Sequence, residues 1–324
     1  MSLPTNTLAT YEAIGNREDL TDVIYRIDPT DTPFLSGAEK ATASAVKHEW
    51  QVQALGTALT TNAQLEGDDI SADATTVTVR KSNIAQISRK VPQVSGTQNA
   101  VDHAGRGNEM AYQEMLKGLE LKRDMEGSLI ASTNGSTTGS DTTIRRLGSV
   151  INWIGTNTNR STGTTTGVDP TGASSFDGTG QVTNGTQRAF TEAQLKSVLQ
   201  SIWTAGGKPD TVMVGAFNKQ QFSTFTGRSS PIEQASSKKI VASVDAYESD
   251  FGTLKVVPNR FQRTRDVWIF QMDMWAVAYL KGRRMISVQM PPTGDSQRRM
   301  ILSEYTLEAR NEKASGTVAD LTTS

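Results

Sequence analysis

Residues 46–54 of this chain read VKHEWQVQA, and residues 76–91 read TVTVRKSNIAQISRKV. In the first run, Trp50 and its even-numbered neighbours alternate with charged and amide side chains, which is the pattern of a half-buried strand. In the second run the apolar residues share the odd positions, which predicts one apolar face: Val77, Val79, Ala85, Ile87 and Val91. Turn-forming residues, Gly67-Asp68-Asp69, lie between the runs. The sequence therefore predicts a long two-stranded hairpin over residues 46–94.

This hairpin contains too little apolar bulk to form a core of its own. An isolated two-stranded ribbon is only marginally stable in water. It persists when it lies on another surface, which is either the rest of its own domain or a neighbouring subunit. The hairpin sequence alone leaves both interpretations open.

Composition excludes several classes of protein. The chain has 324 residues, and its 33 Lys and Arg against 34 Asp and Glu give a net charge of −1, so it is not a general polycation. It has no cysteine, which removes disulfides and thiolate chemistry and fits assembly in a reducing cytosol. Neither a secretory signal nor an apolar run long enough to span a bilayer is recognisable, so we expect no membrane association.

The rest of the chain mixes helices and strands without a regular repeat. Apolar periodicity predicts a long helix over residues 108–132 and a capped helix from Thr191 through Trp203, with a shorter helix over 218–225. Charged pairs on the long helix, among them Lys122 with Glu126, predict a solvated face. Strands are predicted at 211–214, 240–244, 254–257, 267–271, 275–280, 285–290 and 300–308. The fold class is therefore α+β.

Two segments are predicted to lie outside this core. Residues 1–45 read as an extended arm with a short helix at 17–27, and Pro29 and Pro33 stiffen the chain before Phe34. Residues 132–187 are rich in Ser, Thr, Gly and Asn, with a compact apolar patch only at 147–154. This second segment is either a disordered linker or an ordered surface insertion.

No catalytic or cofactor motif is recognisable. The two histidines, His48 and His103, lack the spacing of metal ligands, and we expect His48 to be a half-buried strand residue. Gly105-Arg106-Gly107 has Met110 where a dinucleotide loop would have its third glycine. Basic clusters at 260–265, 281–284 and 298–299 are typical of solvated faces or intersubunit ion pairs. We expect no catalytic, cofactor-binding or metal-binding residues, and no enzymatic activity.

The order of these elements resembles the Hong Kong 97-type major capsid (head) protein of tailed bacteriophages. Local motifs that strengthen the resemblance span nearly the whole chain: GNREDL (15–20), PTDTPF (29–34), TQRAFTE (186–192), GAFNKQ (215–220), GDS (294–296), EYTLE (304–308) and RNE (310–312). The resemblance implies an N-arm over residues 1–45 and an E-loop hairpin over 46–94. It also implies a peripheral (P) domain with its spine helix over 95–135 and 265–324. The axial (A) domain, with the polar insertion, would cover 136–264.

The resemblance implies a structural subunit that self-assembles, as hexamers and pentamers, into the icosahedral head shell around double-stranded DNA. It implies location in the virion capsid after assembly in the host cytoplasm. The N-arm motif begins near Met1, so we expect a separate scaffolding protein rather than a fused one, together with a portal. Further expected partners are a decoration protein and non-specific contacts with packaged DNA. Rival interpretations are an encapsulin-like compartment, a tail-tube or decoration protein and, more distantly, an intracellular hydrolase.

Six residues are the candidate intersubunit contacts. Trp50 is expected to anchor the hairpin, and Phe34 to anchor the N-arm. Polar contacts are expected from the charged residues of the arm and of the second hairpin run: Arg17, Glu18, Asp19 and Arg80.

Overall fold

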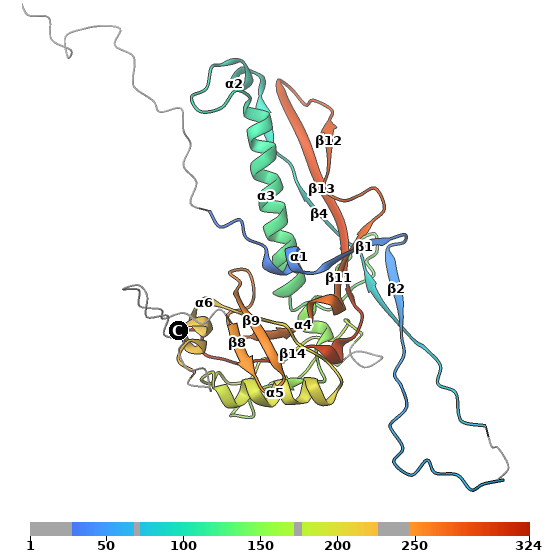
Figure 1. Ribbon diagram of the computed structural model, residues 1–324. Helices are drawn as coiled ribbons and strands as arrows, with labels where there is room; N and C mark the ends of the chain where they lie inside the picture. The colour runs from blue at the N-terminus through green and yellow to red at the C-terminus, as the bar shows by residue number, and fades with distance from the viewer. Residues whose placement is uncertain (1–27, 68–71, 172–176, 226–245) are drawn as a thin grey trace, which may run out of the picture.

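Two β-sheets and one long helix organise the chain (Figure 1). The computed structural model describes residues 28–67, 72–171, 177–225 and 246–324. The expected helix at 17–27, the expected strand at 240–244 and the contacts expected of Arg17, Glu18 and Asp19 lie outside the described residues. Mixed helices and strands confirm the α+β class.

The first sheet is built around one long strand, β13 (Ser296–Ala309). Along one side of β13 run β12 (Ile286–Met290) and β11 (Trp275–Leu280), both antiparallel to it. Along the other side run β4 (Gln86–Lys90) and β5 (Gln93–Ser95). A parallel strand that the sequence did not predict, β1 (Glu39–Ala43), completes the sheet beside β11.

The helix α3 (Glu109–Ile130) packs on one face of this sheet, and it confirms the predicted long helix. Asn108 caps its start, because the Asn108 side chain accepts a hydrogen bond from the backbone N–H of Ala111. The last turns bury Leu121, Met125 and Leu129, as the apolar stripe predicts. The predicted solvated face is wrong at one position, because the Glu126 side chain is fully buried.

The second sheet has six strands in the order β6 (Thr158–Asn159), β14 (Gly316–Val318), β10 (Val267–Phe270), β7 (Thr211–Val214), β9 (Gly252–Pro258) and β8 (Ala246–Ser249). The helix α5 (Glu192–Thr204) packs against it and starts at the predicted cap, Thr191. A short helix, α6 (Ala216–Phe222), follows β7. Other short helices are α1 (Pro33–Gly37), α2 (Gly96–Ala100), α4 (Val150–Trp153), η1 (Met272–Met274) and η2 (Glu312–Ala314).

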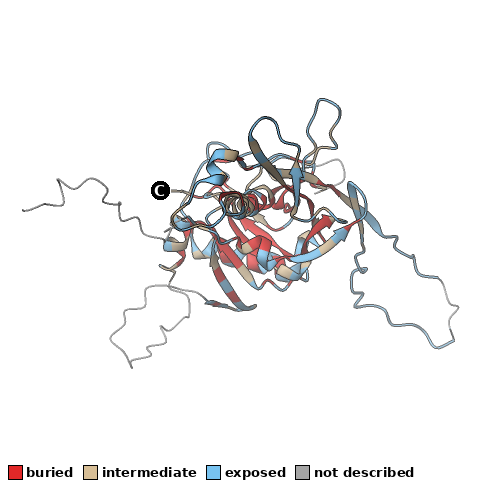
Figure 2. Ribbon diagram, turned by 90° about the horizontal axis from the view of Figure 1, so that it is seen from above, coloured by how far each residue is buried: buried red, intermediate tan, exposed pale blue. Residues whose placement is uncertain are grey.

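The two sheets share a core where the chain passes from one to the other. The strands β10 and β14 lie in the second sheet, although residues 265–324 were expected to belong to the P domain. The reason is chain connectivity: β10 leads directly through η1 into β11, so one polypeptide passes from one sheet to the other. Aromatic rings fill this junction, with Phe270 5.8 Å from Trp275 between ring centroids. In Figure 2 the buried residues gather in the middle of the molecule.

The polar insertion is an ordered part of the fold over its described residues. The predicted apolar patch at 147–154 is buried, and α4 lies within it. Gly178 has a φ of +78°, and a side chain there would come within 2.7 Å of the Trp153 ring, so glycine is required at that position. The interpretation as a disordered linker is therefore wrong for these residues.

Candidate intersubunit surfaces

The base of the predicted hairpin is formed by β2 (Lys47–Val52) and β3 (Val79–Ile84), which pair antiparallel. On β2, His48, Trp50 and Val52 are half-buried while the residues between them are exposed, which confirms the predicted alternation. The hairpin is shorter than expected. After Ala85 the chain changes partner and enters the first sheet as β4.

Apart from Ala85, the predicted apolar face of the second run is not buried in this chain. The exposed members are Val77, Val79, Ile87 and Val91. Val77 and Val79 lie where the hairpin has left the body of the protein. In β4 the even-numbered residues face α3 instead, where Lys90 pairs with Asp124 at 2.7 Å. The odd-numbered apolar residues of β4 consequently point away from α3 and remain available to another molecule.

Trp50 anchors the hairpin to its own chain. Its indole N–H donates to the carbonyl oxygen of Ala309 at 2.9 Å, and its ring lies 5.3 Å from the ring of Trp153. On the facing strand, the buried Asn83 side chain donates to the carbonyl oxygens of Gly148 and Leu307. These contacts fix the direction in which the hairpin leaves the body.

His48 forms a further contact at the base of the hairpin. Its Nε2 lies 3.1 Å from Oε2 of Glu308, which also accepts a hydrogen bond from Arg310. The hydrogen bond with His48, followed by that with Arg310, holds the pKa of Glu308 below its usual value of 4.5, although burial opposes the shift. His48 is thus the half-buried strand residue that the sequence predicts.

The lowered pKa of Glu308 predicts a specific loss of stability in acid. Because the folded-state pKa is lower than the unfolded-state value, the stabilisation is complete above about pH 4.5 and is lost as the pH falls through the folded-state pKa. We expect the free energy of unfolding to fall less steeply below pH 4.5 in Glu308→Gln than in the unmodified chain. Urea unfolding at a series of pH values measures this slope. Equal slopes in the two proteins would show that Glu308 does not contribute the acid-sensitive stabilisation.

The described parts of the hairpin loop, residues 53–67 and 72–78, project far from the body (Figure 1). Its described apolar side chains are exposed, with Leu55 at 97%, Leu59 at 74% and Leu65 at 79% of their full accessible surface. Between 53 and 78 the sequence contains four acidic residues and no Lys or Arg: Glu66, Asp68, Asp69 and Asp73. Leucines exposed to this extent in an acidic, extended loop are typical of a segment that is covered in an assembly.

Phe34 is placed differently from the expectation. The segment after Pro29 was predicted to be extended, but Pro33 starts the helix α1, where a proline at the first position is favourable. The Phe34 ring is fully buried, 5.4 Å from Phe270 and 6.3 Å from Trp275. It therefore anchors the arm base inside its own chain and has no exposed surface for a neighbouring subunit.

The buried Glu126 carboxylate holds this arm base on α3. Its two oxygens accept the backbone N–H groups of Phe34 at 2.9 Å and Leu35 at 2.7 Å, and the side-chain amide of Asn259 at 2.7 Å. Burial raises the pKa of Glu126, and these three hydrogen bonds oppose the shift. One carboxylate thus joins the arm base, the long helix and the loop after β9. The sequence showed only an acidic residue at helical pair spacing and missed this role.

Arg80 lies on the exposed side of β3. Its side chain is 70% exposed, and its guanidinium is 3.6 Å from the carboxylate of Glu49 across the hairpin. An exposed ion pair of this kind contributes little to stability. Arg80 remains a candidate contact to a neighbouring subunit.

The face of the first sheet that points away from α3 carries a buried charge centre with an apolar surround. Glu304 is almost fully buried and forms ion pairs with Arg145 and Arg283. Ile87 lies directly opposite Glu304 in the sheet and is exposed, as is Ile144 beside Arg145. Two exposed or partly exposed cations border this face: Arg89, two residues after Ile87 on β4, and Arg283, whose side chain is 42% exposed and pairs with Glu304. We call this surface, residues 87, 89, 144–145, 283 and 304, the outer face.

A second charge cluster holds the polar insertion. Asp320 is buried, and its carboxylate accepts the backbone N–H groups of Ser161 at 3.2 Å and Gly185 at 2.8 Å, and Nη2 of Arg265 at 2.9 Å. Asp320 has a φ of +61°, which is unfavourable for residues other than Gly, Asn and Asp. It therefore ties both ends of the segment 161–185 to the C-terminal part of the chain.

Two features of catalytic and membrane proteins are absent from the described residues. In those parts of the chain, no three His, Cys, Asp or Glu side chains are grouped so that they could hold a metal ion. None of the helices that the structure describes is both long and apolar enough to cross a membrane.

Comparison with known proteins agrees with this architecture. The family model described as SU10 major capsid protein matches residues 3–322. The major capsid protein of Escherichia phage Phieco32 is 27% identical over 344 residues, covering 98% of this chain and 97% of that relative. A solved chain of Gordonia phage Cozz has a TM-score of 0.60 at 9% identity and covers 95% of this chain and 92% of its own. A solved chain from the capsid of a native GTA particle also has a TM-score of 0.60, at 11% identity. The match covers 95% of this chain and 96% of that chain.

The arrangement of long hairpin, spine helix and two sheets is that of the Hong Kong 97-type fold, and this fold defines a class of shell-building proteins. The chain belongs to the SU10 major capsid protein family. It is a structural subunit of a phage capsid shell, as the sequence motifs predicted.

Proposed function

We propose that copies of this chain close into an icosahedral shell because each hairpin loop lies across the outer face of a neighbouring copy. The observation that carries the proposal is the loop itself, whose leucines at 55, 59 and 65 are exposed in the isolated chain. Many such contacts, each modest, give a stable shell when they are closed simultaneously. Hexamers and pentamers around packaged double-stranded DNA are the assembly that we propose.

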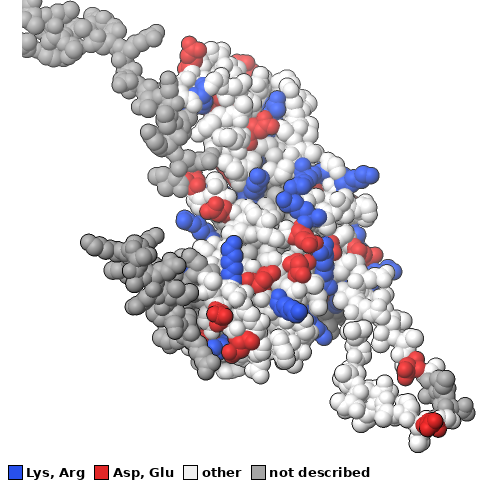
Figure 3. Space-filling view, viewed as in Figure 1, with Lys and Arg blue, Asp and Glu red and all other residues white. Residues whose placement is uncertain are grey.

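Charge complementarity supports the outer face as the receiving surface. The loop is acidic, whereas Arg89 and Arg283 are basic side chains exposed or partly exposed at the outer face. In Figure 3 the described part of the loop carries acidic side chains, and Lys and Arg side chains gather over the first sheet. Opposite charges at two surfaces guide their approach and fix their register. The exposed Ile87 and Ile144 offer apolar contact to the loop leucines.

The remaining roles belong to the same proposal. Arg17, Glu18, Asp19 and Arg80 would form polar contacts between subunits. A separate scaffolding protein and a portal would act during assembly in the host cytoplasm, with a decoration protein and non-specific DNA contacts as additional interactions. Assembly, without catalysis, would be the whole activity of the chain.

The domain organisation that we propose follows the structure where it differs from the expected ranges. The E-loop hairpin would comprise residues 47–84, since β4 belongs to the first sheet. The P domain would contain the first sheet and α3. The A domain would contain the second sheet with α5, including β10 and β14.

Deletion of residues 56–71 tests the loop contact. The deletion leaves the β2–β3 pairing intact, so we expect a folded chain with an unchanged thermal midpoint. Because the loop contact is lost at every subunit, we expect the yield of closed shells in negative-stain images to fall by about tenfold or more. A folded deletion variant that still closes normal shells would refute the proposal.

Two length-preserving variants separate the apolar and charged parts of the loop. The first replaces Leu55, Leu59 and Leu65 by Ser, and the second replaces Glu66 and Asp73 by Gln and Asn. We expect the leucine variant to reproduce most of the deletion's effect and the charge variant to slow assembly mainly at low salt. The contents of the particles distinguish a phage head, which holds double-stranded DNA, from an encapsulin-like compartment, which holds protein cargo.

A further inference from the structure

The second sheet has two edges with opposite chemical character. Among the described residues, β8 and β6 are the first and last strands of the sheet, and with a strand spacing of about 4.8 Å they lie roughly 24 Å apart. Neither edge is used by the loop contact proposed above. A subunit with complementary surfaces on opposite edges can bind further copies head to tail, and such contacts form rings when the rotation closes.

The β8 edge is acidic and aromatic. Glu248 and Asp250 are exposed at the β8–β9 turn, and the chain has no Lys or Arg from 246 to 254. Beside the turn, the Phe251 ring lies 5.5 Å from the ring of Trp203, whose side chain is 58% exposed. An exposed Trp in a surface with few charges is typical of the centre of a protein interface.

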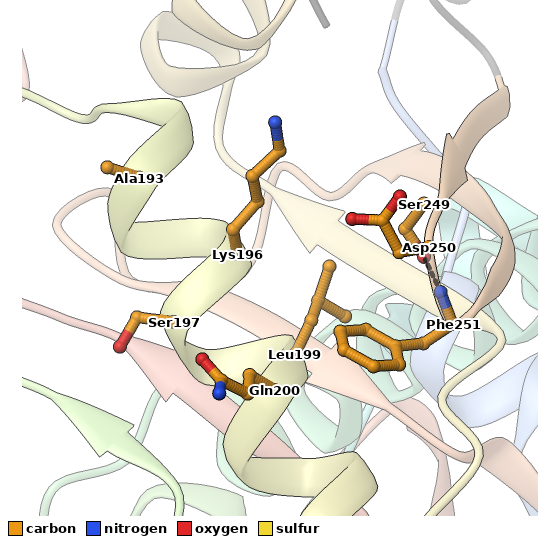
Figure 4. A pocket seen from close by; sticks show the side chains of 8 residues that line it. All are labelled: Ala193, Lys196, Ser197, Leu199, Gln200, Ser249, Asp250 and Phe251. Carbon is orange, nitrogen blue, oxygen red and sulfur yellow. Dashed lines mark hydrogen bonds between the residues drawn. The ribbon is translucent and has the colours of Figure 1, made fainter. Parts of the chain in front are cut away.

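A groove separates this turn from α5, with a volume of about 410 Å³. Figure 4 shows the groove with Lys196 and Gln200 on the helix and with Asp250 and Phe251 on the facing turn. The Lys196 ammonium forms an ion pair with Glu192 at 2.8 Å, one turn earlier on the helix. Because Lys196 is already paired, the carboxylates of Glu248 and Asp250 give this edge a negative charge.

The β6 edge is basic. A pocket of about 480 Å³ lies beside β6, and it is lined by Arg160, Arg188 and a set of hydroxyl and glycine residues: Thr158, Ser161, Thr162, Thr166 and Gly167. Asp169 is the acidic residue of the lining, and it pairs with Nε of Arg160. Two arginines against one aspartate leave the lining with a net positive charge.

The arginines of this pocket are incompletely satisfied within the chain. The Arg160 side chain is 6% exposed, and its Nη2 has no hydrogen-bond partner among the described residues. Arg188 donates through Nη2 to Asn159, while its Nε likewise lacks a partner in the described parts of the chain. Arginine forms charge-assisted hydrogen bonds with carboxylates, so a pocket that both arginines line favours an added carboxylate.

We propose that the acidic β8–β9 turn of one copy docks at the Arg160 and Arg188 pocket of the next copy, so that the second sheets form a closed ring. Glu248 and Asp250 supply the carboxylates, and Trp203 with Phe251 supplies the apolar part of the contact. The exposed Val168 beside the pocket is the matching apolar residue on the neighbour. The proposal rests on the shell assembly proposed above and adds a specific contact within each hexamer or pentamer.

Disulfide trapping tests this contact directly, because the chain contains no cysteine of its own. The test pair is Asp250→Cys with Thr166→Cys, both at exposed positions. The control pair is Asp250→Cys with Thr143→Cys, where the second position is equally exposed but outside the pocket. Each protein is assembled under reducing conditions, oxidised, and separated on a non-reducing denaturing gel. Negative-stain images of the same samples record the shells.

We expect the test pair to give a ladder that extends to covalent pentamers and hexamers, with about tenfold more cross-linked chain than the control pair. Adding Glu248→Lys to the test pair should reduce the ladder several-fold, because it reverses a charge that faces the arginines. Shells without a ladder above the control, or a product that stops at dimers, would overturn the ring contact and leave the shell function standing. A ladder without shells would support the contact and count against the shell function, and the absence of both would count against both.

Discussion

Replacement of Glu126 by Ala is expected to lower the free energy of unfolding by about 3–5 kcal/mol, because each buried donor left without an acceptor costs roughly 1–3 kcal/mol. The three donors involved are the backbone N–H groups of Phe34 and Leu35 and the side-chain amide of Asn259. The Glu126 side chain is fully buried, so bulk water does not compete for these donors. The loss is measured by urea unfolding.

The Glu126→Ala substitution should also destabilise the chain locally, at the arm base. We expect a protease to cut the Glu126→Ala variant faster within residues 28–38, because the carboxylate holds α1 on α3. Glu126→Gln should lie between the two proteins, since it keeps one acceptor oxygen but turns an amide N–H toward a donor. Glu120→Ala is the matched control on the same helix. Its exposed pairs with Lys117 and Lys90 predict a change of about 1 kcal/mol or less. Equal destabilisation in Glu120→Ala and Glu126→Ala would contradict the assigned role.

Replacement of Asp320 is expected to release the polar insertion. The side chain accepts three hydrogen bonds while the backbone has a positive φ, and two substitutions separate these features. Asp320→Gly removes the acceptors but accommodates the backbone, and we expect a loss of about 3 kcal/mol of unfolding free energy. Asp320→Ala also removes the acceptors, and in addition it places a Cβ on a residue with positive φ, which costs about 1 kcal/mol more.

Hydrogen exchange locates the effect of these substitutions. The backbone N–H groups of Ser161 and Gly185 donate to Asp320, so their protection should fall before that of α3. Asp320→Asn, which tolerates the same φ and keeps one acceptor oxygen, should be the mildest of the three variants. If Asp320→Gly were as stable as the unmodified chain, the carboxylate would have no part in holding the insertion.

Features that depend on neighbours in the sequence were predicted well. The long helix starts after the Asn108 cap, α5 starts after the Thr191 cap, and β7 covers the predicted residues 211–214. The alternation of β2 is also as expected. Helix caps and strand alternation depend on side chains within a few positions of one another, so a single sequence contains the whole signal.

The candidate surfaces were predicted only in part. The hairpin could be inferred, because an amphipathic ribbon must lie on something. Trp50 was expected to be an intersubunit contact, but its ring packs against its own chain. The acceptor of the Trp50 N–H could not be inferred, since Ala309 is distant in the sequence. The burial of Phe34 in its own chain was missed for the same reason. The sequence can identify an aromatic ring as an anchor, but it does not show which surface the ring packs against.

By itself, the sequence determined the secondary structure of the longer elements, the α+β class and, through its ordered motifs, the capsid family. Only the tertiary structure decided which polar groups are buried. Glu126 reads as a surface residue of a helix, and Asp320 follows the last strand without any distinguishing pattern, yet each accepts three hydrogen bonds in the interior. The physical reason is that a buried carboxylate is stabilised by donors from several distant segments, and these meet only when the chain has folded.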